Sequence, residues 1–318
     1  MNPLRPVILA AAGSPRMKKV LTGTPVTAGI VRRFVAGETR RDLLPVVVDL
    51  LGSDRLISVD FLGEYTTDRA RADATVAEYL SLINDLAALG RRDPPGVEPA
   101  PVEVSVKLSA LGQALPVDGP AIATDNLHTL CTKAAEAGVW VTVDAEDHTA
   151  TDATLASVRA LRPEFPWLGT VLQAYLRRTE SDCADFAGPG SRIRLCKGAY
   201  REPHGVAFQH ASEVTDSYLR CLEVLMRGAG YPMVATHDPV LVRAAEAMAA
   251  ETNRPAQRFE HQMLYGIREA EQLRLTEAGY ALRVYIPYGN EWYGYLTRRL
   301  AERPANLSFF LRALVSRS

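Results

Sequence analysis

Short β-rich runs alternate with longer amphipathic stretches along most of this chain, and this alternation constrains the fold more than any other feature. Each run is rich in Val, Ile, Leu and aromatic residues and is bounded by Gly, Pro or charged residues, as strands are. Eight strands that alternate with helices over about 260 residues are typical of a (β/α)8 barrel. The expected strands are residues 56–63, 102–109, 139–145, 170–175, 193–199, 231–236, 258–262 and 282–287.

The remaining segments complete this interpretation. We therefore expect an α/β fold, a distorted (β/α)8 TIM barrel with extra N-terminal helices from about residue 18 to residue 51. The expected domains are an N-terminal helical segment, residues 1–55, that packs on a catalytic barrel, residues 56–318. A doubly wound sheet is the alternative, but no GxGxxG motif follows the first strand. The expected barrel helices are 69–89, 122–137, 153–161, 214–227, 239–251 and 267–278.

Composition narrows the class of protein. Hydrophobic residues make up 47% of the 318 residues, which is enough for a full core. A net charge of −1, from 36 basic and 37 acidic residues, argues against a nucleic-acid-binding protein. The 4 cysteines form no CxxC pair and no HExxH motif occurs, so no metal site or disulfide framework is predicted. Cysteine usage favours a cytoplasmic location, and no apolar run reaches the length of a membrane-spanning helix.

Polar residues end seven of the eight expected strands. Catalytic groups of a barrel lie at the carboxyl ends of its strands, so these residues predict a shared functional mouth. Each also has a structural alternative: Lys107 and Asp144 as a buried ion pair, or His237 as a core histidine. The set comprises Lys107, Asp144, Gln173, Arg194 with Lys197, Thr236 with His237, Glu260 with Gln262, and Tyr285.

The segment 283–306, RVYIPYGNEWYGYLTRRLAERPAN, carries two adjacent arginines on an expected helix. Tyr295 precedes Arg298 by three residues and Arg299 by four, so the three side chains share a helix face. Two guanidinium groups beside aromatic rings suit a small carboxylate with an apolar body, because arginine binds carboxylates bidentately. The alternative is a solvated helix on which the arginines pair with Glu302.

Seven segments, in this order, resemble the monofunctional flavin-dependent proline dehydrogenases. They are VSVKLSAL, VTVDAED, VLQAYLRR, IRLCKGAYRE, VATHD, FEHQMLYG and the 283–306 segment, and the resemblance extends over about residues 56–310. It implies a distorted (β/α)8 barrel that binds FAD noncovalently. It also implies oxidation of L-proline to Δ1-pyrroline-5-carboxylate, with hydride transfer from proline C5 to flavin N5, as the first step of proline catabolism to glutamate.

The same resemblance implies a role for each matching residue. Lys107, Arg298 and Arg299 would hold the proline carboxylate, while Tyr285 and Tyr295 would line the pocket around the ring. Asp144 and Arg194 would lie closest to the reaction, Arg194 near flavin N5. The residues expected to bind FAD are Ala145, Gln173, Arg194, Cys196, Lys197, Gly198, Thr236, His237 and Glu302, the last of which would also pair with an arginine on the eighth helix.

Partners and departures follow from the resemblance as well. Membrane quinone would accept the electrons, which implies transient contact with the inner face of a membrane, and a separate pyrroline-5-carboxylate dehydrogenase would take the product. Asp238 stands where family members often have Asn, and Cys196 stands where a β-branched residue is common. Tyr285 favours proline, because relatives that prefer hydroxyproline often have a smaller residue there.

Three alternatives remain open at this point. The first is a dehydrogenase for hydroxyproline or another cyclic amino acid on the same flavin barrel. The second is a Schiff-base aldolase with Lys107 or Lys197 as its nucleophile, which requires a lowered lysine pKa. The third is an amino-acid-binding barrel without catalytic activity.

Overall fold

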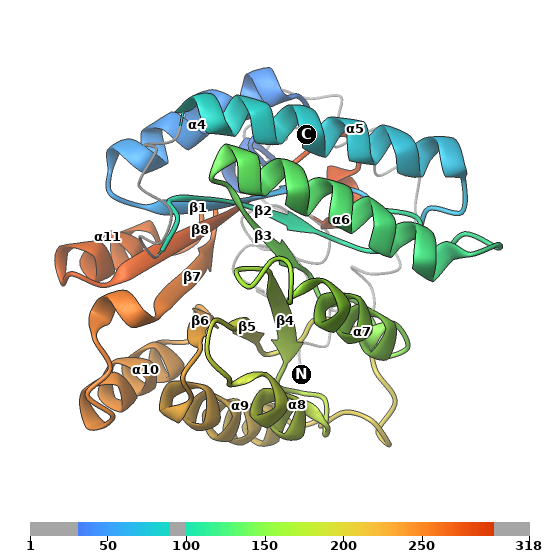
Figure 1. The fold of residues 1–318 in the computed structure, drawn as a ribbon. Helices are drawn as coiled ribbons and strands as arrows, with labels where there is room; N and C mark the ends of the chain where they lie inside the picture. Colours follow the sequence, from blue (N-terminus) through green and yellow to red (C-terminus); the bar gives the residue numbers. More distant parts are fainter. Residues whose placement is uncertain (1–30, 90–98, 296–318) are drawn as a thin grey trace, which may run out of the picture.

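Eight parallel strands close into a barrel in sequence order, with β8 hydrogen-bonded to β1 (Figure 1). The computed structural model describes residues 31–89 and 99–295. Helices between successive strands cover the outside of the barrel (Figure 1). The expected (β/α)8 barrel is therefore confirmed. The strands are β1 (Leu56–Phe61), β2 (Val102–Val106), β3 (Trp140–Val143), β4 (Gly169–Gln173), β5 (Arg192–Cys196), β6 (Tyr231–Ala235), β7 (Glu260–Leu264) and β8 (Ala281–Tyr288).

The helices also follow the expected order. Helix α4 precedes β1, which confirms that the chain has a helix before the first barrel strand. The expected helical residues before residue 31 lie outside the described part. The boundary between residues 55 and 56 remains a prediction. Helix α8 was not predicted, because eight residues give little more than two turns of periodicity. The helices are α4 (Arg40–Gly52), α5 (Arg69–Leu89), α6 (Gly119–Ala137), α7 (Thr151–Leu161), α8 (Thr179–Phe186), α9 (Ala211–Arg227), α10 (Pro239–Glu251) and α11 (Glu269–Glu277).

Six of the eight strands end one to three residues earlier than the sequence predicts, and two of these endings, those of β2 and β5, shape the mouth of the barrel. After Val106 the chain turns, because the N–H groups of Ala110 and Leu111 donate to the carbonyl of Lys107. After Cys196, Gly198 adopts φ +107°, a conformation that favours glycine. The predicted residues at these ends therefore lie in loops at the carboxyl edge of the barrel.

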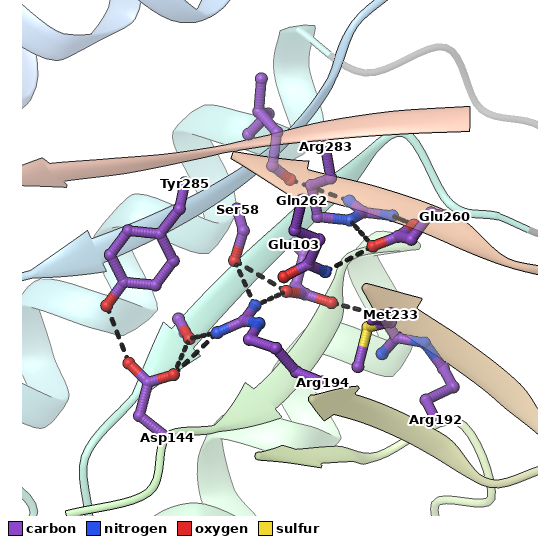
Figure 2. Close-up of polar contacts among 12 residues, drawn as sticks. Ser58, Glu103, Asp144, Arg192, Arg194, Met233, Glu260, Gln262, Arg283 and Tyr285 are labelled. Atoms are coloured by element: carbon purple, nitrogen blue, oxygen red, sulfur yellow. Dashed lines mark hydrogen bonds and ion pairs between the residues drawn. The ribbon is translucent and has the colours of Figure 1, made fainter. Parts of the chain in front are cut away.

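The barrel interior is unusually polar for this fold. Strand residues that face the helices are apolar and fully buried, such as Val104 and Val141. Inside the barrel, hydrogen bonds cross from Arg194 on β5 to Ser58 on β1 and to Glu103 on β2 (Figure 2). Branched apolar residues usually fill this space, so charged groups here must be paired with one another.

None of the helices within residues 31–89 and 99–295 is long and apolar enough to cross a membrane.

Candidate active site

A cavity of about 1100 Å³ opens at the carboxyl ends of the strands. Every described residue to which the resemblance assigns a role lines it. Arg298, Arg299 and Glu302 lie outside the described residues. The predicted residues that line the cavity are Lys107, Asp144, Ala145, Gln173, Arg194, Cys196, Lys197, Gly198, Thr236, His237, Tyr285 and Tyr295.

Lys107 lies directly after β2 and is bound by two carboxylates. Its Nζ donates to both carboxylate oxygens of Asp60 at 2.8 Å and lies 3.6 Å from Oδ2 of Asp144. Burial acts to lower the pKa of Lys107, but Asp60 and Asp144 outweigh burial and hold that pKa above its usual range. Burial raises the pKa of Asp60, against the opposing effect of Lys107. Lys107 is therefore a fixed cation at the cavity wall.

Asp144 lines the cavity and is hydrogen-bonded to polar groups of the barrel interior, as Figure 2 shows for its contacts with Arg194 and Tyr285. Its Oδ1 accepts from Arg194 and from the Ser105 hydroxyl, each at 2.7 Å, and its Oδ2 accepts from the Tyr285 hydroxyl at 2.8 Å. Burial and the Asp144 carboxylate raise the pKa of Tyr285 well above its ordinary value. The phenol therefore stays protonated and donates to Asp144, which holds both side chains in place.

Arg194 is bound through both terminal nitrogens. One donates to Ser105 at 2.8 Å and to Asp144, and the other donates to Ser58 at 3.1 Å and to Glu103 at 2.6 Å. Its Nε is buried and has no hydrogen-bond partner among the described residues. Arg194 also lines the cavity, so this side chain with one unpartnered donor borders the space in which a ligand would lie.

The loops after β5 and β6 form the opposite wall. Nζ of Lys197 donates to Asp238 at 2.7 Å, and Asp238 also caps α10 by accepting from the N–H of Val240 at 3.0 Å. Nε2 of His237 accepts from the N–H of Leu264 at 2.9 Å, so a neutral ring carries its proton on Nδ1.

Gly198 and Gln173 lie in the same region of the cavity. A Cβ on Gly198 would meet the Tyr175 ring at 2.2 Å, so only glycine lets the chain pass there. Nε2 of Gln173 donates to the backbone carbonyl of Glu146 at 2.8 Å, which fixes its amide. Both residues therefore shape the wall without side-chain charge.

Sequence reasoning missed Asp60 and Glu103, and it placed Glu260 wrongly at the mouth. Glu260 is fully buried, pairs with Arg283 and does not itself line the cavity, whereas Gln262, predicted with it, lines the cavity and donates to Glu260. Asp60 and Glu103 each lie inside an expected strand, and an acidic residue within a buried strand was the available signal. Clusters of three or more His, Cys, Asp or Glu side chains that could hold a metal ion are absent from the described ranges.

A closed (β/α)8 barrel with a charged cavity at the carboxyl ends of its strands has the architecture of a barrel enzyme. The chain belongs to the proline dehydrogenase family, since the family model described as proline dehydrogenase matches residues 50–312.

Named relatives agree with the family match. Proline dehydrogenase 1 of Bacillus subtilis subsp. natto is 35% identical over 286 residues, which cover 90% of this chain and 91% of the relative. Proline dehydrogenase of Deinococcus radiodurans is 34% identical over 313 residues, covering 98% and 97%. The crystal structure of proline utilization A from Bdellovibrio bacteriovorus superposes with a TM-score of 0.80 at 27% identity, over 95% of this chain and 35% of that protein. This chain thus spans about a third of the length of that solved protein.

Proposed function

We propose that this protein oxidises L-proline to Δ1-pyrroline-5-carboxylate with FAD bound in the cavity, as the first step of proline catabolism to glutamate. The observation that carries the proposal is the convergence of Lys107, Asp144, Arg194 and Tyr285 at one cavity wall. This group provides a fixed cation, a bound carboxylate, and an arginine with one unused donor. Such a set suits a small zwitterion beside a flat, electron-accepting ring.

Lys107 would bind the proline carboxylate. It is charged at neutral pH because Asp60 holds its pKa high, and its side chain is 11% exposed at the cavity. Tyr285 and Tyr295 would enclose the pyrrolidine ring, and both line the cavity. Arg298 and Arg299 would complete the carboxylate site, an assignment that comes from the sequence alone.

The residues present fit FAD. The buried Nε of Arg194 is a hydrogen-bond donor without an acceptor among the described residues, and the Lys197 ammonium suits a phosphate or a ring oxygen. Ala145, Gln173, Cys196, Gly198, Thr236 and His237 would complete the FAD site, with Glu302 added from the sequence. FAD, when bound, supplies the acceptor for the hydride that leaves proline C5.

The protein residues would orient the substrate, and the pKa shifts of two of them rule these two out as acceptors of the amine proton. Fixing the carboxylate sets the direction in which C5 faces, and orientation of this kind is worth several kcal/mol, roughly 7–11 in the best intramolecular cases. At neutral pH neither Lys107 nor Tyr285 can take the amine proton, because the first stays charged and the second stays a neutral phenol. The raised pKa of Lys107 also disfavours a Schiff-base aldolase that uses this lysine.

The electrons and the product require partners. The resemblance to monofunctional members supports membrane quinone as acceptor, with transient contact at the inner face of the membrane from the cytoplasm. It also supports transfer of the product to a separate pyrroline-5-carboxylate dehydrogenase.

The test is the visible spectrum of the purified protein, recorded before and after anaerobic addition of L-proline. We expect flavin bands that bleach with L-proline and bleach much more slowly with hydroxyproline, since the resemblance implies that Tyr285, which lines the cavity, favours proline. Bands that stay unchanged with proline but bleach with hydroxyproline would show that the substrate is hydroxyproline and not proline. A colourless protein that cannot be reconstituted with FAD would end the proposal.

A further inference from the structure

Glu103 connects Arg194 to a second arginine, Arg192, inside the barrel (Figure 2). It lies on β2, is fully buried, and is not one of the described residues that line the cavity. Its Oε1 accepts from Arg194 at 2.6 Å and from the Ser58 hydroxyl at 2.7 Å. Its Oε2 accepts from Arg192. One carboxylate therefore holds two guanidinium groups.

These contacts fix the plane of the Arg194 guanidinium. Asp144 holds one terminal nitrogen from the cavity side, and Glu103 holds the other from the barrel interior. With both terminal nitrogens fixed, the direction of Nε is fixed as well, because the guanidinium is planar. Without Glu103, the second nitrogen would keep only the longer contact to Ser58, at 3.1 Å.

Charge strengthens the same conclusion. Arg192 and Arg194 are both buried, and Glu103 is the carboxylate that they share. Burial acts to raise the pKa of Glu103, but Arg192 and the neighbouring arginines outweigh burial and hold that pKa well below its usual range. Removal of this charge would leave two like charges facing each other in the interior, and Arg194 would be driven toward Asp144.

We propose that Glu103 is a positioning residue for proline oxidation, which holds the Arg194 guanidinium in its orientation at the cavity wall. The inference rests on the proposed function, because the orientation of Arg194 matters for catalysis only if FAD and proline meet in this cavity. Glu103 itself touches neither the cavity nor its contents. It acts through Arg194.

The experiment compares Glu103→Gln with Glu260→Gln as the matched control. Glu260 is an equally buried strand carboxylate that pairs with an arginine, Arg283, but it does not contact Arg194. A glutamine at 260 keeps an oxygen to which Gln262 can still donate. Each variant removes a buried charge that pairs with an arginine, so both should lose stability, measured as the melting temperature of the flavin-loaded protein.

Only Glu103→Gln should change the chemistry. We expect its kcat to fall roughly 10- to 100-fold with the proline KM within about threefold of wild type, as for the loss of a charged hydrogen bond. The visible circular dichroism of bound oxidised FAD should shift in Glu103→Gln and stay unchanged in Glu260→Gln, which gives a readout independent of activity. Glu103→Asp, which keeps the charge but is one methylene shorter, should fall between wild type and Glu103→Gln.

The outcomes are distinguishable. Equal kcat values in the two glutamine variants, or a loss confined to KM, would overturn the positioning role. If Glu103→Gln does not fold, Glu103→Asp decides, because unchanged kcat and dichroism there would also overturn the role. A wild-type flavin that L-proline does not bleach would instead end the proposed function.

Discussion

Two arginines in the same barrel interior show how a structural charge differs from a functional one. Arg283 is fully buried near the amino end of β8, which we call the closed end of the barrel because the cavity lies at the carboxyl ends of the strands. All three of its nitrogens donate to partners within the chain, namely Glu260 and the carbonyls of Ile57 and Ala100. Arg194 lies at the cavity end, is bound through both terminal nitrogens, and has no described partner for Nε. Because Arg194 lines the cavity and Arg283 does not, we expect Arg283 to hold the barrel together and Arg194 to serve a bound ligand.

The largest effect should come from breaking the closed end. Arg283→Met would leave Glu260 charged and buried without its partner, and would free two backbone carbonyls. We expect the free energy of unfolding to fall by about 3–5 kcal/mol, because one member of a buried pair is removed. Urea denaturation followed by circular dichroism measures it. A loss below about 1 kcal/mol would mean that the closed end is not the structural half.

His261 sharpens the comparison, because it is a buried group whose two ring nitrogens have no described partner, yet it does not line the cavity. Burial lowers its pKa to about 4. The unfolded chain takes up the proton near pH 6.5 and the folded protein only near pH 4, so stability is lost as pH falls through that window. The loss approaches ~3 kcal/mol at ~1.4 kcal/mol per pH unit.

His261→Leu should remove this part of the pH dependence without changing proline turnover. Urea denaturation at several pH values between 4 and 7 measures the first effect, and steady-state kinetics at neutral pH measures the second. A large loss of turnover in this variant would show that an unsatisfied polar group away from the cavity also serves the reaction.

Lys107→Met tests the cavity end. The change removes the cation that would bind the substrate carboxylate, so we expect the proline KM to rise roughly 30- to 100-fold, or about 2–3 kcal/mol, while FAD content stays near wild type. Inhibition by cyclopentanecarboxylate, which lacks the amine, should weaken in parallel. Unchanged inhibition would assign Lys107 to structure alone, with Asp60 as its partner.

Asp238→Asn should give the smallest effect. The Lys197–Asp238 pair is partly exposed, at 36% and 30%, and pairs of this kind are worth about 0–1 kcal/mol. Asparagine keeps an oxygen for the cap of α10 but releases the lysine, so FAD should bind the apoprotein about two- to fivefold more tightly. Fluorescence titration with FAD measures this. The gain should vanish when Lys197→Met is added, and a gain that persists would place its cause elsewhere.

The order of strands and helices could be predicted from the sequence, because the alternation of apolar and polar residues sets it locally. The residues of the cavity could be predicted as well, since Lys107, Asp144 and Tyr285 stand at the ends of expected strands. Short elements could not, as α8 shows. The barrel alone brings Glu103 on β2 beside Arg194 on β5, 91 residues apart, and no pattern along the chain marks that pair.

Glu260 illustrates the opposite error. It stands near the end of an expected strand and was therefore assigned to the mouth, but β7 begins at Glu260 and ends at Leu264. A shift of a few residues in a strand boundary moves a side chain from one end of the barrel interior to the other. Strand boundaries are what the sequence leaves uncertain, because neighbouring strands, not local residues, decide where pairing stops.

The most direct test compares Arg194→Lys with Arg283→Lys in one measurement, the rate at which L-proline reduces the bound flavin under anaerobic conditions. Lysine keeps the charge in both but loses the planar guanidinium. The account predicts that Arg194→Lys reduces its flavin at least about 100-fold more slowly than wild type, whereas Arg283→Lys stays within about threefold despite a lower melting temperature. Equal slowing of both variants would contradict the division of the barrel interior into a structural end and a catalytic end.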